Sequence, residues 1–149
     1  MILKCAIIDD EPLAVELLSS YVNKTPFLKL TGAYNSASTA IRDLRENPVD
    51  LIFLDIQMPE LSGIEFAKIL PQETRIIFVT AFSQYAVEGY KVNALDFILK
   101  PVVYEQLAMT MDKVLAVTSK YHKEKQLLVA EGERKCKIST EDILYIEVV

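Results

Sequence analysis

Cys5-Ala6-Ile7-Ile8-Asp9-Asp10-Glu11 is the stretch that decides the fold, because a short apolar run ends abruptly in three acidic residues. Three later apolar runs also end before one polar residue: Leu51–Leu54 before Asp55, Ile76–Val79 before Thr80, and Phe97–Leu99 before Lys100. Segments of helical period separate the runs, an alternation typical of repeated βαβ units around a parallel sheet. In such a sheet the carboxyl ends of the strands share the edge where ligands bind. The sequence therefore predicts an α/β fold whose site is assembled from four distant segments.

The same alternation predicts five strands interleaved with five helices. The expected elements, in chain order, are a strand ending at Ile8, a helix from Pro12 to about Tyr21, a strand over 28–34, a helix capped by Ser36, a strand over 51–54, a helix after Gly63, a strand over 76–79, a weaker helix over 83–92, a strand over 95–99 and a long helix from 102 to about 125. The apolar face of the first helix is expected to consist of Leu13, Leu17, Leu18 and Tyr21. Gly63 is expected to take backbone angles that other residues resist.

Length and composition narrow the class of protein. The 149 residues suit one main domain, and no stretch approaches the roughly 18–20 uncharged apolar residues of a membrane helix. The first residues lack the zones of a secretory signal, so we expect a cytoplasmic protein without a membrane partner. The net charge of −5 disfavours a strong nucleic-acid surface on the chain as given, since such surfaces neutralise phosphates with clustered Lys and Arg.

The polar residues at the shared edge suit phosphoryl chemistry. A carboxylate such as Asp55 can attack a phosphoryl group and keep it, provided the charged oxygens are neutralised. Asp9, Asp10 and Asp55 supply the hard oxygen ligands that Mg2+ prefers. Lys100 can pair with one phosphate oxygen, and Thr80 can donate a hydrogen bond to another.

Each of these residues also has an ordinary explanation. Acids after a strand can offset a helix macrodipole, a lysine at a strand end can be solvated, and a threonine can cap a turn. Taken together they are harder to explain, because several carboxylates at one edge repel one another unless a cation compensates them.

Four motifs carry a resemblance to a known family. Ile7-Ile8-Asp9-Asp10-Glu11, Phe53-Leu54-Asp55-Ile56-Gln57-Met58-Pro59, Val79-Thr80-Ala81 and Leu99-Lys100-Pro101 resemble the signatures of response-regulator receiver domains. The match covers roughly residues 1–120, with the motifs in the family's order. It implies a flavodoxin-like, doubly wound, five-stranded parallel sheet of order 2-1-3-4-5.

The resemblance also implies roles for individual residues. Asp55 would be the phosphoacceptor, and Asp9, Asp10, Asp55 and the backbone carbonyl of Gln57 would bind Mg2+. Thr80 and Lys100 would form the switch pair, with a cis bond before Pro101. The switch aromatic of the fifth strand would be Phe97, which lacks the hydroxyl of the family's usual tyrosine and so can pack inward but cannot hydrogen-bond outward.

The C-terminal segment resembles a second family. Beyond residue 125 the apolar period changes from helical to two, and Ile138-Ser139-Thr140-Glu141-Asp142-Ile143-Leu144-Tyr145-Ile146-Glu147 is similar to the start of LytTR-type DNA-binding domains. We expect residues 121–126 to be a linker or an extension of the last helix, and residues 127–149 to be the incomplete start of that domain. DNA binding is therefore expected only of the full-length output domain.

These features predict a two-component switch rather than an enzyme. A sensor histidine kinase would phosphorylate Asp55, with at most slow self-dephosphorylation, and so control transcription through the output domain. A homodimer contact is expected through the fourth helix, the fifth strand and the last helix. The alternative is an aspartyl-nucleophile phosphatase of the haloacid dehalogenase type, but such enzymes place an acid two residues after the nucleophile, where this chain has Gln57.

Overall fold

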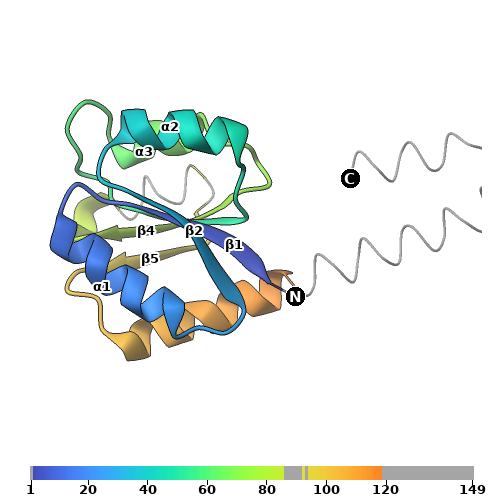
Figure 1. The fold of residues 1–149 in the computed structure, drawn as a ribbon. Coiled ribbons are helices and arrows are strands. Elements are labelled where there is room, and N and C mark those ends of the chain that lie inside the picture. The colour runs from blue at the N-terminus through green and yellow to red at the C-terminus, as the bar shows by residue number, and fades with distance from the viewer. Residues whose placement is uncertain (1, 86–91, 93, 119–149) are drawn as a thin grey trace, which may run out of the picture. The chain divides into compact units, whose positions relative to one another are not determined.

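The computed structural model describes residues 2–85, 92 and 94–118. In this part of the chain five parallel strands form one sheet of order β2-β1-β3-β4-β5 (Figure 1), which confirms the predicted topology. The strands are β1 (Leu3–Ile8), β2 (Leu28–Tyr34), β3 (Leu51–Leu54), β4 (Arg75–Thr80) and β5 (Asp96–Leu99). The sheet lies within residues 2–108, the first of two units into which the chain divides after Ala108.

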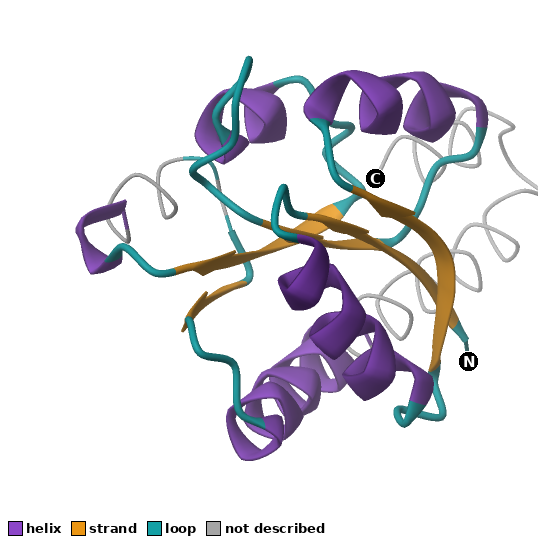
Figure 2. Ribbon diagram, turned by 60° about the vertical axis from the view of Figure 1, so that its left-hand side comes forward, coloured by secondary structure: helices purple, strands orange, loops and turns teal. Residues whose placement is uncertain are grey.

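Helices cover both faces of this sheet (Figures 1 and 2). The described helices are α1 (Pro12–Asn23), α2 (Ala37–Glu46), α3 (Gly63–Lys68), the short 3-10 helix η1 (Ser83–Tyr85) and a helix that begins at residue 104 and is described to residue 118. Helices α2 and α3 lie on one face and α1 on the other (Figure 1). None of the described helices is long and apolar enough to cross a membrane.

The core explains why the sequences of the strands are continuous runs of apolar residues. Every residue of β3 is buried, as are five of the six residues of β1, because both faces of these strands are covered by helices. One core cluster joins the sheet to α2 and α3, and includes Ile52, Leu54, Phe66 and Phe78. Its formation holds the β3 end and the start of α3 next to each other.

Side-chain caps start two of the helices. Ser36 accepts a hydrogen bond from the backbone N–H of Thr39 at 3.4 Å, so it caps α2 as the sequence predicts. Ser62 caps α3 in the same way, accepting from the N–H of Glu65 at 3.2 Å. The cap fixes where α3 begins after the loop that follows Asp55.

The predicted buried face of α1 is partly wrong. Leu18 is buried as expected, but Leu13 is 78% exposed and Leu17 is 40% exposed, while Val22 is fully buried. The cause is the narrow stripe with which α1 contacts the sheet, since Leu18 and Val22 lie four residues apart on that stripe.

The predicted reason for Gly63 is also wrong. No glycine in the described residues has a positive φ; that backbone angle belongs to Glu60, with φ of 71°, at the centre of a tight turn in which Leu61 N donates to Pro59 O at 2.8 Å. Gly63 is required because a Cβ there would collide with the carbonyl oxygen of Asp55 and lie 2.8 Å from the Cα of Ile56.

The last two predicted helices differ in extent. Of the predicted helix over 83–92, the structure describes only η1, a turn at Val92 and none of residues 86–91. The last helix begins at residue 104 rather than 102, and its expected end near 125 lies outside the described residues. The predicted linker over 121–126 and the β-rich segment over 127–149 also lie outside them.

Candidate functional site

Backbone hydrogen bonds align the carboxyl ends of the central strands. Asp55 N donates to Ile8 O at 2.9 Å, and Asp9 N donates to Tyr34 O at 3.0 Å. On the other side of the sheet, Lys100 N donates to Thr80 O at 2.8 Å. These bonds continue the parallel ladder to the strand ends, so the polar residues that follow β1, β3 and β5, and Thr80 at the end of β4, meet at one edge, as the sequence predicts.

Four acidic residues meet at this edge. Ligand oxygens of Asp9, Asp10, Glu11 and Asp55 all lie within 4.8 Å of one another. Asp9 and Asp55 are buried, with 1% and 4% of their surface exposed, whereas Glu11 is exposed. So many carboxylates at this spacing repel one another and require nearby positive charge.

Lys100 supplies part of that charge. Its Nζ lies 2.7 Å from Asp9 Oδ2, 3.4 Å from Glu11 Oε1 and 3.6 Å from Asp55 Oδ2. Only 14% of the lysine side chain is exposed, so these contacts are weakly screened by solvent. The ammonium therefore sits between the acids that follow β1 and the acid that follows β3.

The pKa values reflect this crowding. Burial raises the pKa of Asp55 to about 7 from 3.8, with a further increase from the charge of Asp9; Lys100 acts in the opposite direction. Burial by itself would lower the pKa of Lys100, but its contacts with Asp9, Asp55 and Glu11 outweigh burial and raise that pKa. Asp55 thus needs more positive charge nearby to be fully ionised at neutral pH.

The donor set fits a magnesium ion. One ammonium faces four carboxylates in this cluster, so the described groups leave net negative charge at the edge. Carboxylate oxygens are the ligands that Mg2+ prefers, with water and backbone carbonyls completing its six positions. The cluster is confirmed by the structure, and the identity of each ligand stays a prediction.

The remaining predicted residues lie at the end of β4, on β5 and directly after Lys100. Thr80 is fully buried at the end of β4, and its Oγ1 accepts from Phe82 N at 3.4 Å. Phe97 is half-buried and its ring centroid lies 6.4 Å from that of Phe78, so it packs toward the core as its missing hydroxyl suggests. The bond between Lys100 and Pro101 is cis.

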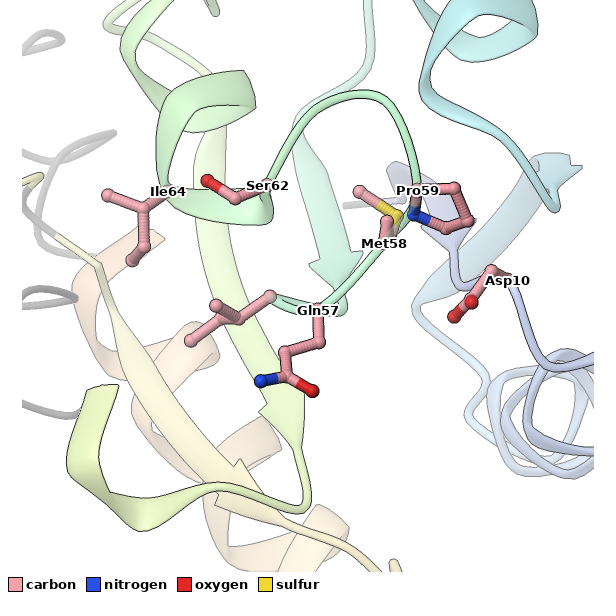
Figure 3. A pocket seen from close by; sticks show the side chains of 7 residues that line it. Asp10, Gln57, Met58, Pro59, Ser62 and Ile64 are labelled. Carbon is pink, nitrogen blue, oxygen red and sulfur yellow. The ribbon is translucent and has the colours of Figure 1, made fainter.

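A cavity of about 470 Å³ lies beside Asp10 and the loop that follows β3 (Figure 3). Its lining residues are Asp10, Ile56, Gln57, Met58, Pro59, Ser62 and Ile64. The carboxyl of Asp10 lies at one end of this cavity, whose wall is about equally polar and apolar, and the sequence did not predict the cavity. The sequence also assigned Glu11 no role of its own; its place directly after the acid pair indicated only that it would lie near Asp9 and Asp10, and the contact with Lys100 depends on the fold.

Comparisons with known proteins agree with this geometry. The family model of the response regulator receiver domain matches residues 5–112. The sensory transduction protein LytT of Bacillus anthracis is 35% identical over 144 residues, which cover 95% of this chain and 54% of that protein. The transcriptional regulatory protein BtsR of Escherichia coli is 36% identical over 120 residues, which cover 79% of this chain and 50% of that protein.

A solved structure of a response regulatory domain has the same fold as this chain. The crystal structure of the response regulatory domain of protein mrkE from Klebsiella pneumoniae matches with a TM-score of 0.73 and 31% identity, over 78% of this chain and 98% of that one. The chain spans about half the length of the curated relatives that it matches. The phosphatase alternative is not favoured by these matches. Receiver domains of this kind bind Mg2+ in an acidic pocket and interact with sensor histidine kinases, and this chain belongs to the family of response-regulator receiver domains of two-component systems.

Proposed function

We propose that Asp55 accepts a phosphoryl group from a sensor histidine kinase in a reaction that requires Mg2+, and that this controls a DNA-binding output region of the full-length protein. The observation that carries the proposal is the meeting of Asp9, Asp10 and Asp55 within 4.8 Å, with Lys100 Nζ 3.6 Å from Asp55. No single strand provides this arrangement.

In the proposed reaction an oxygen of Asp55 attacks phosphorus as the bond between phosphorus and the donor's imidazole nitrogen breaks. The carboxylates of Asp9, Asp10 and Asp55, with the backbone carbonyl of Gln57, would hold the magnesium ion. When bound, the ion supplies positive charge that neutralises the phosphoryl oxygens. Because the pKa of Asp55 is about 7, added positive charge also favours its reactive ionised form.

Two side chains would read the phosphorylated state. Lys100 Nζ is close enough to Asp55 to pair with a phosphoryl oxygen after a small shift, and Thr80, which carries the hydroxyl, is the last residue of the neighbouring strand β4. Phosphorylation adds about −1.5 to −2 charge, which draws both donors toward it. Phe97 and Pro101 are proposed to complete this switch, since they lie on β5 and directly after Lys100.

The proposed role in transcription rests on the relatives. BtsR is named a transcriptional regulatory protein, which supports a regulatory rather than an enzymatic role and a DNA-binding region in the full-length protein. The division into a receiver over 1–120, a linker over 121–126 and the start of a LytTR-type domain over 127–149 stays a prediction, as does the cytoplasmic location. A homodimer through the predicted fourth helix, β5 and the last helix is also proposed; exposed Leu99, Val103 and Tyr104, on β5 and near the start of the last helix, support it.

The test is phosphorylation by a small phosphodonor such as acetyl phosphate with Mg2+. We expect about one phosphoryl group per chain, none in Asp55→Asn, and unchanged labelling in Asp112→Asn, which makes the same substitution at an exposed site. A chelator should abolish labelling of the parent protein. Labelling that survives in Asp55→Asn would contradict the proposal, and repeated turnover of a phosphate ester would favour the phosphatase alternative.

A further inference from the structure

Glu11 is at the N-cap position of α1, but its side chain does not cap the helix. Glu11 makes no side-chain capping hydrogen bond, and glutamate is not among the residues that cap helices well. Its backbone is nevertheless firmly held: its N–H donates to Asp9 Oδ1 at 2.9 Å, and its carbonyl accepts from Ala14 and Val15 at 3.1 and 3.2 Å. Capping therefore does not explain the side chain.

The Glu11 side chain turns instead toward Lys100. Its Oε1 lies 3.4 Å from Nζ, and it is 66% exposed, whereas Asp9, the other partner from the same loop, is 1% exposed. Lys100 thus contacts two carboxylates that are predicted to bind metal, Asp9 and Asp55, and one that is not. Glu11 is the partner that remains if the other two are taken by a cation.

We propose that Glu11 is a positioning residue for Lys100: it holds the ammonium when Mg2+ takes the oxygens of Asp9 and Asp55. The inference rests on the proposed function, since it assumes the magnesium site. Nζ lies 2.7 Å from Asp9 Oδ2, so a divalent cation bound to that oxygen would repel the ammonium at short range. Contact with Glu11 lowers the free energy needed to move Lys100 away from Asp9 while keeping it near Asp55.

The test is the Mg2+ dissociation constant, measured by calorimetry without any phosphodonor. The variants are Glu11→Gln, which removes the charge and with it the ion pair to Lys100; Glu11→Asp, which keeps the charge; and Glu16→Gln, which removes an exposed charge elsewhere on α1. Aspartate is shorter by about 1.5 Å and caps helices well, so it is drawn to the backbone N–H groups of α1 and away from Lys100.

We expect both Glu11 variants to bind Mg2+ about three- to fivefold more weakly, the size of effect known for partly exposed ion pairs, and Glu16→Gln to bind as the parent does. Parent-like binding by Glu11→Asp would overturn the proposal, because charge without the contact would then suffice. Parent-like binding by both Glu11 variants would overturn it as well. Circular dichroism melts check that each variant is folded.

Phosphorylation kinetics give a second measurement. If Glu11 holds Lys100 once Mg2+ has taken the oxygens of Asp9, the Glu11 variants should need about a three- to fivefold higher Mg2+ concentration for half-maximal labelling. Their labelling rate at saturating Mg2+ should stay within about twofold of the parent rate. A loss of maximal rate with unchanged Mg2+ dependence would count against the role. If the parent protein does not bind Mg2+, the proposed function itself is wrong. If the parent binds Mg2+ and the Glu11 variants bind it equally well, only the role of Glu11 is wrong.

Discussion

The ammonium of Lys100 lies 2.7 Å from Asp9 Oδ2 and 3.6 Å from Asp55 Oδ2, so the lysine is paired more closely with a predicted metal ligand than with the predicted phosphoacceptor. Both carboxylates are buried, and Lys100 is largely shielded from solvent. Its position therefore affects stability, metal binding and phosphorylation together.

Replacing Lys100 should destabilise the domain most at alkaline pH. Lys100→Met removes the charge that lowers the pKa of Asp55 and leaves Asp9 without its ion-pair partner. We expect a loss of about 2–4 kcal/mol in the free energy of unfolding at pH 8, because a buried carboxylate loses its compensating charge. Urea unfolding measures this. Millimolar Mg2+ should restore part of the loss, and Lys29→Met, at an exposed position of β2, should change little.

Asp55→Asn should change how stability depends on pH. The pKa of Asp55 is about 7 in the folded protein against an ordinary value of 3.8, so between these values the folded state holds the proton and the unfolded state does not. The stability of the parent should therefore fall as pH rises from about 4 to 7. The asparagine variant lacks this fall. The difference in the free energy of unfolding between the variant and the parent should therefore shift in favour of the variant by up to about 4 kcal/mol across that interval, at about 1.4 kcal/mol per pKa unit. An advantage that shrinks with rising pH would contradict the direction of the shift.

Two glycines should respond differently to alanine. In Gly63→Ala the new Cβ would meet the backbone of Asp55 and Ile56, which cannot move without displacing the acid itself. We expect a loss of about 2–3 kcal/mol, as for other overpacked sites, together with weaker Mg2+ binding. In Gly32→Ala the Cβ would meet the end of the Tyr34 side chain, which can rotate away. Equal losses in the two variants, measured by urea unfolding, would refute this difference.

Adjacent leucines of α1 form a fourth test. Leu18 is 1% exposed and Leu17 is 40% exposed. Leu18→Ala should lower the free energy of unfolding by about 2–4 kcal/mol, because it leaves a cavity against the sheet, and Leu17→Ala should lower it by less than about 1 kcal/mol. Thermal melts of the two variants measure this difference, and Leu18→Ala should melt at the lower temperature. Similar melting temperatures would contradict the observed orientation of α1.

Much of the fold could be predicted from local patterns. The runs ending at Ile8, Leu54, Val79 and Leu99 were recognisable as strands because a parallel sheet covered on both faces demands continuous apolar residues. Their polar ends could be placed at one edge because all strands of a parallel sheet point the same way. The family motifs then predicted the order of the strands, which the structure confirms.

Three details could not be predicted in this way. The apolar residues of α1 show a helical period, but the exposure of Leu13 and Leu17 depends on how wide a stripe the sheet leaves to cover. Gly63 looked like a residue for unusual backbone angles, and its actual constraint is the approach of a distant backbone. Glu11 looked like one more acid in a run, until the fold brought Lys100 to it.

The sequence by itself determined that acids, a hydroxyl and a lysine would gather at one edge of a parallel sheet, because the direction and ending of each strand are local properties of the chain. The tertiary structure alone decided which carboxylates share Lys100 and at what distance. Ion pairing and steric contact fall off over a few ångströms, and separations on that scale between segments far apart in sequence are set by the packing of the whole core.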